Sequence, residues 1–181
     1  MQTTIRSLVT RRTGYLAGFF ICIGLLAFAL YLQYFEQQDP CPLCILQRIA
    51  FLTLMFVFLV AAIHGPGRVG GIVYGCVLFV VAAAGAAIAT RHVWLQHLPK
   101  DQVPACGPGL EYMLKNFPLS RALGKILSGS GECAEAGWKF LGLSIAGWSL
   151  VWFSLFGLFA VFLAVLAVRD TAGDSGRRPA L

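Results

Sequence analysis

Four long apolar stretches constrain the fold of this chain more than any other feature of its sequence. They cover approximately residues 14–32, 44–63, 69–90 and 141–168, and Arg48 is the single charged residue within them. At about 1.5 Å per residue, a helix of this length crosses most or all of a hydrocarbon core of roughly 30 Å. Only 12% of the residues are charged, about half the share in soluble domains. We therefore predict an all-α integral membrane protein, a four-transmembrane-helix bundle that forms a single domain over residues 1–181.

Basic residues indicate which ends of the predicted helices face the cytoplasm. Arginines precede the first span, Arg68 lies in the turn after the second, and Arg169 follows the fourth. The loop 33–43 contains acidic residues and no base. Because positive charge is retained on the cytoplasmic side, both termini are expected there, and the loops 33–43 and 91–140 outside. The net charge of +6 thus indicates topology rather than a nucleic-acid-binding surface.

The six cysteines fall into two groups. Cys22 and Cys76 lie within apolar runs, where a thiol behaves as a small hydrophobic group. The other four lie in the two outer loops: Cys41, Cys44, Cys106 and Cys133. Cysteines in extracytoplasmic loops commonly form disulfides. Two of them form a C-x-x-C motif, a spacing typical of pairs that exchange disulfides.

Cys44 is expected at the start of the second membrane helix, with Arg48 four residues later on the same helix face. The helix N-terminus and the guanidinium both favour an anion, and the thiolate is the nucleophilic form of cysteine. Two alternatives stay open at this point. The C-x-x-C could be a structural disulfide, and Arg48 could extend to the membrane interface without a chemical role.

A metal site is a further alternative, since a C-x-x-C can supply half of the four ligands of zinc. His92 and His97 lie close to the loop cysteines in sequence, so such a site is not excluded. However, the 26 residues between Cys106 and Cys133 do not match the spacing of a zinc finger or ribbon. We therefore predict no dedicated metal ligands.

Two disulfides on one face of a membrane can pass electrons from an outer protein to a lipid-soluble acceptor by thiol–disulfide exchange. A quinone suits such a site, since its ring can lie near Cys44 while its tail lies in lipid. Arg48 is a candidate donor to the quinone oxygens. His92 and Gln96 share a helix face at the outer end of the third span and are further candidates. For His92 alone, an interfacial histidine without a ligand is an equal alternative.

The long outer loop contains an amphipathic segment. Apolar residues recur at helical spacing over 119–127, which indicates either a short helix on the membrane surface or a loop helix packed on the bundle. Residues 128–131 read Ser-Gly-Ser-Gly, and such runs are flexible. Cys133 is therefore expected just beyond a hinge, where it could change disulfide partners.

Several motifs occur together in an order and spacing that resemble a known family. They are Cys-Pro-Leu-Cys-Ile-Leu-Gln-Arg at 41–48, Arg-His-Val-Trp-Leu-Gln at 91–96, Pro-Ala-Cys-Gly-Pro at 104–108, Gly-Glu-Cys-Ala at 131–134 and Trp-Lys-Phe-Leu-Gly at 138–142. With the four apolar spans, they resemble the disulfide bond formation protein B (DsbB) family. Members of this family are quinone reductases of the bacterial inner membrane that reoxidise the periplasmic thiol oxidase DsbA.

The resemblance implies a role for each loop cysteine. Cys106 and Cys133 match the second-loop pair, in which Cys106 is attacked by reduced DsbA. Cys133 would then attack Cys41, which frees Cys44 beside the quinone. Arg48 matches the arginine that assists quinone binding.

His92 and Gln96 match the segment that lines the quinone pocket. The implied location is the bacterial inner membrane, with both cysteine-bearing loops in the periplasm. The implied partners are a DsbA-like thiol oxidase, the quinone pool and the lipid bilayer. Ubiquinone and menaquinone both remain open as the cofactor. The alternative from another class is a non-enzymatic metal-handling or structural membrane protein.

Overall fold

The computed structural model describes the membrane helices and part of the outer loops. The described residues are 2–37, 40–99, 102, 118, 124, 129, 131–134 and 137–175. Cys106 and nearly all of the predicted surface helix 119–127 lie outside them.

Four long helices make up most of the described residues: α1 (Gln2–Tyr34), α2 (Pro42–His64), α3 (Arg68–Gln96) and α7 (Ile145–Ser175). Each contains a segment long and apolar enough to cross a membrane, which confirms the predicted fold class. One helical turn, α6 (Gly131–Ala134), and a small antiparallel hairpin, β1 (Lys139–Phe140) and β2 (Leu143–Ser144), complete the described part.

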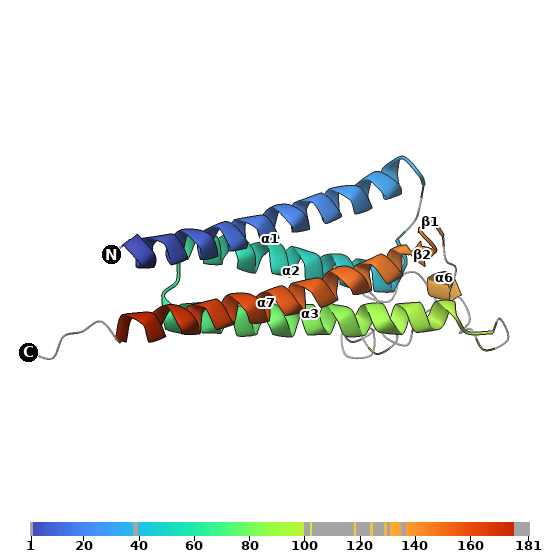
Figure 1. The fold of residues 1–181 in the computed structure, drawn as a ribbon. Helices are drawn as coiled ribbons and strands as arrows, with labels where there is room; N and C mark the ends of the chain where they lie inside the picture. Colours follow the sequence, from blue (N-terminus) through green and yellow to red (C-terminus); the bar gives the residue numbers. More distant parts are fainter. Residues whose placement is uncertain are drawn as a thin grey trace, which may run out of the picture.

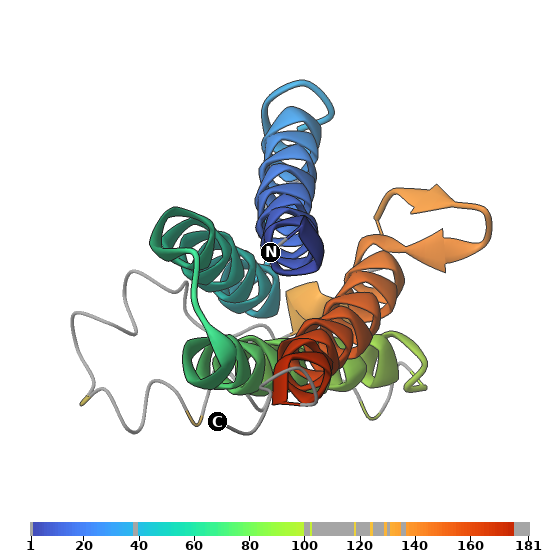
Figure 2. The ribbon, with the colours of Figure 1, turned by 60° about the vertical axis from the view of Figure 1, so that its left-hand side comes forward.

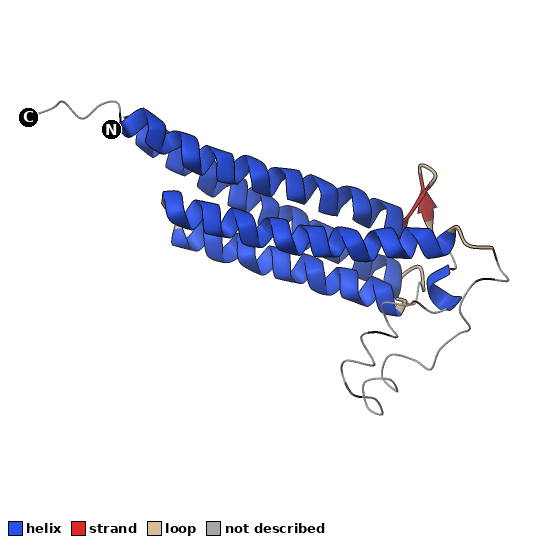
Figure 3. Cartoon of the chain, turned by 90° about the horizontal axis from the view of Figure 1, so that it is seen from below, coloured by secondary structure: helices blue, strands red, loops and turns tan. Residues whose placement is uncertain are grey.

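The helices run up and down the bundle, with α3 packed along α7 and α2 in contact with both α1 and α3 (Figures 1 and 2). The start of α1, the α2–α3 turn and the end of α7 lie at one end (Figure 1). The start of α2, α6 and the hairpin lie at the opposite end (Figure 3). Toward that end the ribbon of α1 tilts away from the other helices (Figure 1).

Local sequence sets both ends of α2. Pro42 occupies the first turn, where its missing N–H costs nothing. Cys41 is the N-cap, and its sulfur accepts a hydrogen bond from the backbone N–H of Cys44. Gly65 ends the helix with a left-handed φ of 57° and donates its N–H to the carbonyl of Ala61, a common helix C-terminus. The helix therefore begins at the first cysteine of the motif.

Small residues let large ones pack in the core. Phe51 on α2 stacks on Phe153 of α7 with ring centroids 4.1 Å apart. The ring of Phe153 lies against Gly85 of α3, where a Cβ would come within 2.4 Å of it. A Cβ on Gly75 would likewise meet Ala164 of α7 at 2.8 Å. The small residues of the third span therefore pack within the bundle.

The fourth helix starts at Ile145, somewhat later than the apolar run at 141–168 suggests. Residues 141 and 142 instead form the turn of the hairpin, with φ of 51° at Leu141 and 81° at Gly142. Two successive left-handed residues match the twist of a two-residue hairpin. Apolar composition alone does not distinguish this turn from a helix, because the turn also carries a leucine.

Candidate functional site

The two cysteines of the C-x-x-C face each other at the start of α2. Their sulfurs lie 3.2 Å apart, as thiols rather than as a closed disulfide. Cys41 is 7% exposed, while Cys44 is partly buried. A small side-chain rotation would bring the sulfurs to the roughly 2.05 Å of a disulfide bond. The pair is therefore placed for reversible oxidation within one helical turn.

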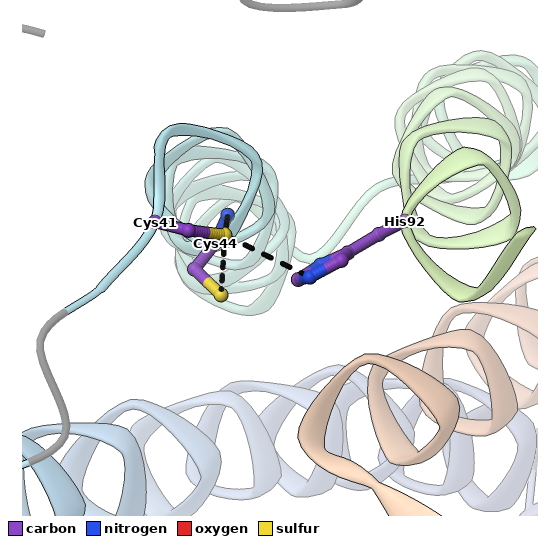
Figure 4. A group of neighbouring side chains, drawn as sticks. All are labelled: Cys41, Cys44 and His92. Carbon is purple, nitrogen blue, oxygen red and sulfur yellow. Dashed lines mark hydrogen bonds between the residues drawn. The ribbon is translucent and has the colours of Figure 1, made fainter. Parts of the chain in front are cut away.

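His92 of α3 points at this pair (Figure 4). Its Nε2 lies 3.7 Å from the Sγ of Cys41. Its Nδ1 lies 3.1 Å from the side-chain nitrogen of Gln47 on α2. Both His92 and Gln47 are buried, each with 3% of its surface exposed. The structure thus joins the second and third helices through a polar contact at the redox pair.

Gln96 continues this polar chain toward α7. The backbone N–H of Gly147 donates to the Ser144 hydroxyl, which donates in turn to Oε1 of Gln96 across 2.6 Å. The amide nitrogen of Gln96 then lies 3.5 Å from Nε2 of His92. His92 and Gln96 therefore share a helix face, as their spacing predicts.

Arg48 is held against α1. Its guanidinium donates to Oε1 of Gln33 and, across 3.1 Å, to the carbonyl of Ala29. Hydrogen bonds to a charged donor are stronger than those between neutral groups. The guanidinium therefore has a fixed place between α1 and α2.

Cys133 lies with the first pair although it belongs to the second outer loop. It is fully buried in α6 and packs with Cys41, Leu43 and Leu95. His92 also interacts with the backbone of Cys133. Of the predicted second-loop pair, the structure thus places Cys133 at the C-x-x-C, while Cys106 lies outside the described residues.

A cavity of about 510 Å³ opens beside these groups. Cys41, Cys44, Arg48, His92 and Gln96 all contribute to its wall. Much of the remaining wall is apolar and aromatic, and includes Phe28, Phe51, Trp138, Trp148 and Trp152. Its volume falls in the range of roughly 300–1,000 Å³ that is usual for small-molecule sites. A mostly apolar wall with few polar groups is also typical of such sites.

Three polar residues of the site are missing from the sequence-based prediction. Gln47 contacts His92, Gln33 contacts Arg48, and Ser144 contacts Gln96. The position of Gln47 could have indicated a buried polar contact, because a polar residue inside an apolar span is costly unless it has a partner. Gln33 and Ser144 lie at the ends of spans, where polar residues are ordinary.

Fold and site together define a class: a multi-pass membrane protein in which a pair of thiols, one buried and one partly buried, lines an apolar cavity. The family model described as "Disulfide bond formation protein DsbB" matches residues 11–163 of the chain. The chain belongs to this family and is a disulfide oxidoreductase that acts in disulfide bond formation. This membership argues against the non-enzymatic alternative.

Relatives from several bacteria support the assignment. The disulfide bond formation protein B of Hahella chejuensis is 57% identical over 145 residues, which cover 80% of this chain and 88% of the relative. That of Nitrosococcus oceani is 54% identical over 166 residues, or 92% of this chain and 96% of the relative. That of Methylococcus capsulatus is 50% identical over 155 residues, which cover 86% of this chain and 94% of the relative. The similarity therefore extends over nearly the whole membrane domain.

Proposed function

We propose that this protein is a thiol:quinone oxidoreductase of the bacterial inner membrane, which takes electrons from a DsbA-like thiol oxidase and passes them to a membrane quinone. One observation carries the proposal. The Cys44 side chain lines an apolar cavity that also contains Arg48 and His92 in its wall. A redox-active sulfur and hydrogen-bond donors thus surround a space for an apolar acceptor.

The cavity suits a quinone head group, ubiquinone or menaquinone, in size and chemistry. Arg48 offers N–H donors to a quinone oxygen, since a guanidinium carries five. Gln96 can offer a further N–H donor from α3, and His92 lines the same wall. The aromatic side chains in the wall suit a flat ring. When bound, a quinone supplies a two-electron, two-proton acceptor.

The cysteines would form a relay. The reduced partner attacks Cys106 of a Cys106–Cys133 disulfide, and the Cys133 thiolate that leaves attacks Cys41. A Cys41–Cys133 bond forms, the Cys41–Cys44 bond breaks, and Cys44 is released as a thiolate beside the cavity. The burial of Cys133 with Cys41 supports this exchange, because attack requires contact between the sulfurs.

The electrons and protons of the proposed reaction balance. The partner loses two electrons and two protons as its two thiols become a disulfide, and the quinone gains both. Both disulfides of the membrane protein are restored at the end of the cycle. The net result is one new disulfide in the partner for each quinone reduced.

The proposed orientation places the redox pair at the periplasmic face. The C-x-x-C lies at the opposite end of the bundle from the α2–α3 turn (Figure 1), after which α3 begins at Arg68. Positive residues favour the cytoplasmic side of a membrane. A periplasmic thiol oxidase would then meet the end of the bundle that contains Cys41 and Cys133.

Quinone reduction by purified full-length protein tests the proposal. The protein, a soluble quinone analogue and a reduced DsbA-like oxidase are mixed, and quinone absorbance is followed. We expect consumption by the unmodified protein and by Cys76→Ser, whose sulfur lies on the exposed surface of α3, and none by Cys44→Ser. Absence of consumption by the unmodified protein, or full activity of Cys44→Ser, would overturn the proposal.

A further inference from the structure

Three potential metal ligands meet at the redox pair. The sulfurs of Cys41 and Cys44 and a ring nitrogen of His92 all lie within 4.8 Å of one another (Figure 4). Cys41 and His92 are buried, and Cys44 is partly buried. The sequence predicts no dedicated metal ligands, because the spacing of Cys106 and Cys133 does not match a zinc motif. Cys44 and His92 are 48 residues apart in the chain, and the packing of α2 against α3 brings them together.

The separations suit tetrahedral zinc. With Zn–S near 2.3 Å and Zn–N near 2.05 Å, a tetrahedral angle places sulfur and nitrogen about 3.6 Å apart and two sulfurs about 3.8 Å apart. The distance from Cys41 Sγ to His92 Nε2 is 3.7 Å. The two sulfurs are 3.2 Å apart, so Cys44 needs only a modest rotation outward.

The hydrogen bonds around His92 favour the tautomer that binds metal through Nε2. Ser144 donates to Oε1 of Gln96, which turns the amide nitrogen of Gln96 toward Nε2 of His92. An N–H donor facing Nε2 requires a lone pair there, so the ring proton lies on Nδ1. The amide nitrogen of Gln47 lies 3.1 Å from Nδ1. The amide would then be turned over so that its oxygen accepts that proton, since the two ends of an amide are interchangeable by rotation. Metal-bound histidines usually donate their other N–H in this way.

We propose that the reduced protein binds a thiophilic divalent cation, with Zn²⁺ as the type, through Cys41, Cys44 and His92. Cys133 packs in the same buried cluster as Cys41, but its sulfur is not among the ligand atoms that lie within 4.8 Å of one another. It would therefore have to move toward them to close the coordination as a third thiolate. Three sulfurs and one histidine are a common structural zinc set. Binding releases the thiol protons to solvent and transfers no electrons.

Metal binding and disulfide formation exclude each other, because each uses the same sulfur lone pairs. A bound cation would therefore hold the protein in its reduced state and stop turnover. This consequence depends on the proposed function, whereas binding itself does not. The two are separated experimentally, since turnover is measured with a chelator present and binding without a quinone.

Cobalt titration tests the site directly. Full-length protein carrying Cys22→Ala and Cys76→Ala is reduced, freed of reductant without oxygen, and titrated with Co²⁺, which reports thiolate ligation by its absorbance. We expect one equivalent to bind with sulfur-to-cobalt and tetrahedral bands, and Zn²⁺ to remove both. The bands should be lost in Cys41→Ser and Cys44→Ser, weakened in His92→Ala and Cys133→Ser, and absent from the oxidised protein.

A second measurement needs no substitution. Zn²⁺ should slow the alkylation of Cys41 and Cys44 in the reduced unmodified protein at least tenfold, as followed by mass spectrometry, and Mg²⁺ should not. Mg²⁺ is the matched control because it prefers oxygen ligands. Cobalt bands that persist in Cys41→Ser and Cys44→Ser, or alkylation that Zn²⁺ leaves unchanged, would overturn the site. Cobalt bands that are unchanged in Cys133→Ser would show that Cys133 is not the fourth ligand.

Discussion

The side chains of Gln47 and His92 are in contact, with 3.1 Å between the Gln47 amide nitrogen and Nδ1 of the imidazole. The two residues are 45 positions apart in the chain. Each belongs to a different membrane helix, and both are buried. The other ring nitrogen faces Cys41. We therefore infer that Gln47 positions His92 relative to the two cysteines.

Replacement of Gln47 by leucine should slow quinone reduction. The substitution leaves Nδ1 of buried His92 without its partner, at a cost of about 1–3 kcal/mol. We expect turnover to fall roughly tenfold, while the helical content stays unchanged. Steady-state kinetics and circular dichroism measure the two quantities.

Gln47→Glu is the matched variant for this prediction. A carboxyl oxygen can accept from Nδ1 as the amide oxygen does, so most of the lost activity should return. If leucine and glutamate at this position are equally slow, the hydrogen bond to His92 is not the cause. If Gln47→Leu turns over like the unmodified protein, Gln47 has no positioning role.

Gln33 should influence quinone binding through Arg48. Removal of the acceptor in Gln33→Leu takes away a charge-assisted hydrogen bond that fixes the guanidinium. We expect the KM for a quinone analogue to rise about fivefold, in line with a bond of about 1 kcal/mol or more, with kcat changed less. Gln37→Leu is the control, because that exposed glutamine contacts the backbone of Tyr34. Equal KM values in the two variants would refute the role of Gln33.

Gly85 should be essential for the aromatic core, because its missing Cβ leaves room for Phe153. Gly85→Ala places a methyl group within 2.4 Å of that ring. Overpacking of this kind costs about 1–3 kcal/mol, so the thermal unfolding midpoint in detergent should fall by several degrees. Gly24→Ala adds the same methyl group on α1, where a Cβ meets nothing within 4 Å. An equal midpoint in the two variants would contradict the packing described.

The burial of Cys133 and Cys41 in one cluster predicts a disulfide that can be trapped. In a protein with Cys44→Ser and Cys106→Ser, the remaining loop thiols are Cys41 and Cys133. Since the two residues pack together in one buried cluster, mild oxidation should join them nearly completely. Mass spectrometry of non-reduced peptides identifies the bond. Recovery of both thiols in reduced form, or intermolecular dimers in their place, would show that Cys133 does not reach Cys41.

Much of the site could be anticipated from local sequence. The C-x-x-C beside a proline predicted a cysteine pair at the start of a membrane helix, and α2 begins there. The four-residue spacing of His92 and Gln96 predicted one shared face. The contact of Arg48 with Gln33 could not be predicted, because it depends on how α1 tilts against α2. The hairpin before α7 was also missed, since apolar residues fill its turn.

The sequence by itself determined that this chain crosses a membrane four times and carries a C-x-x-C at the start of its second apolar span. Long apolar segments of this kind form α-helices in lipid, because a helix bonds each backbone polar group within its own segment. Only the tertiary structure decided which groups surround Cys41 and Cys44. His92, Gln47 and Cys133 reach them through the packing of α2, α3 and α6. Contacts between helices depend on shape complementarity across distant segments, which periodicity within one segment does not encode.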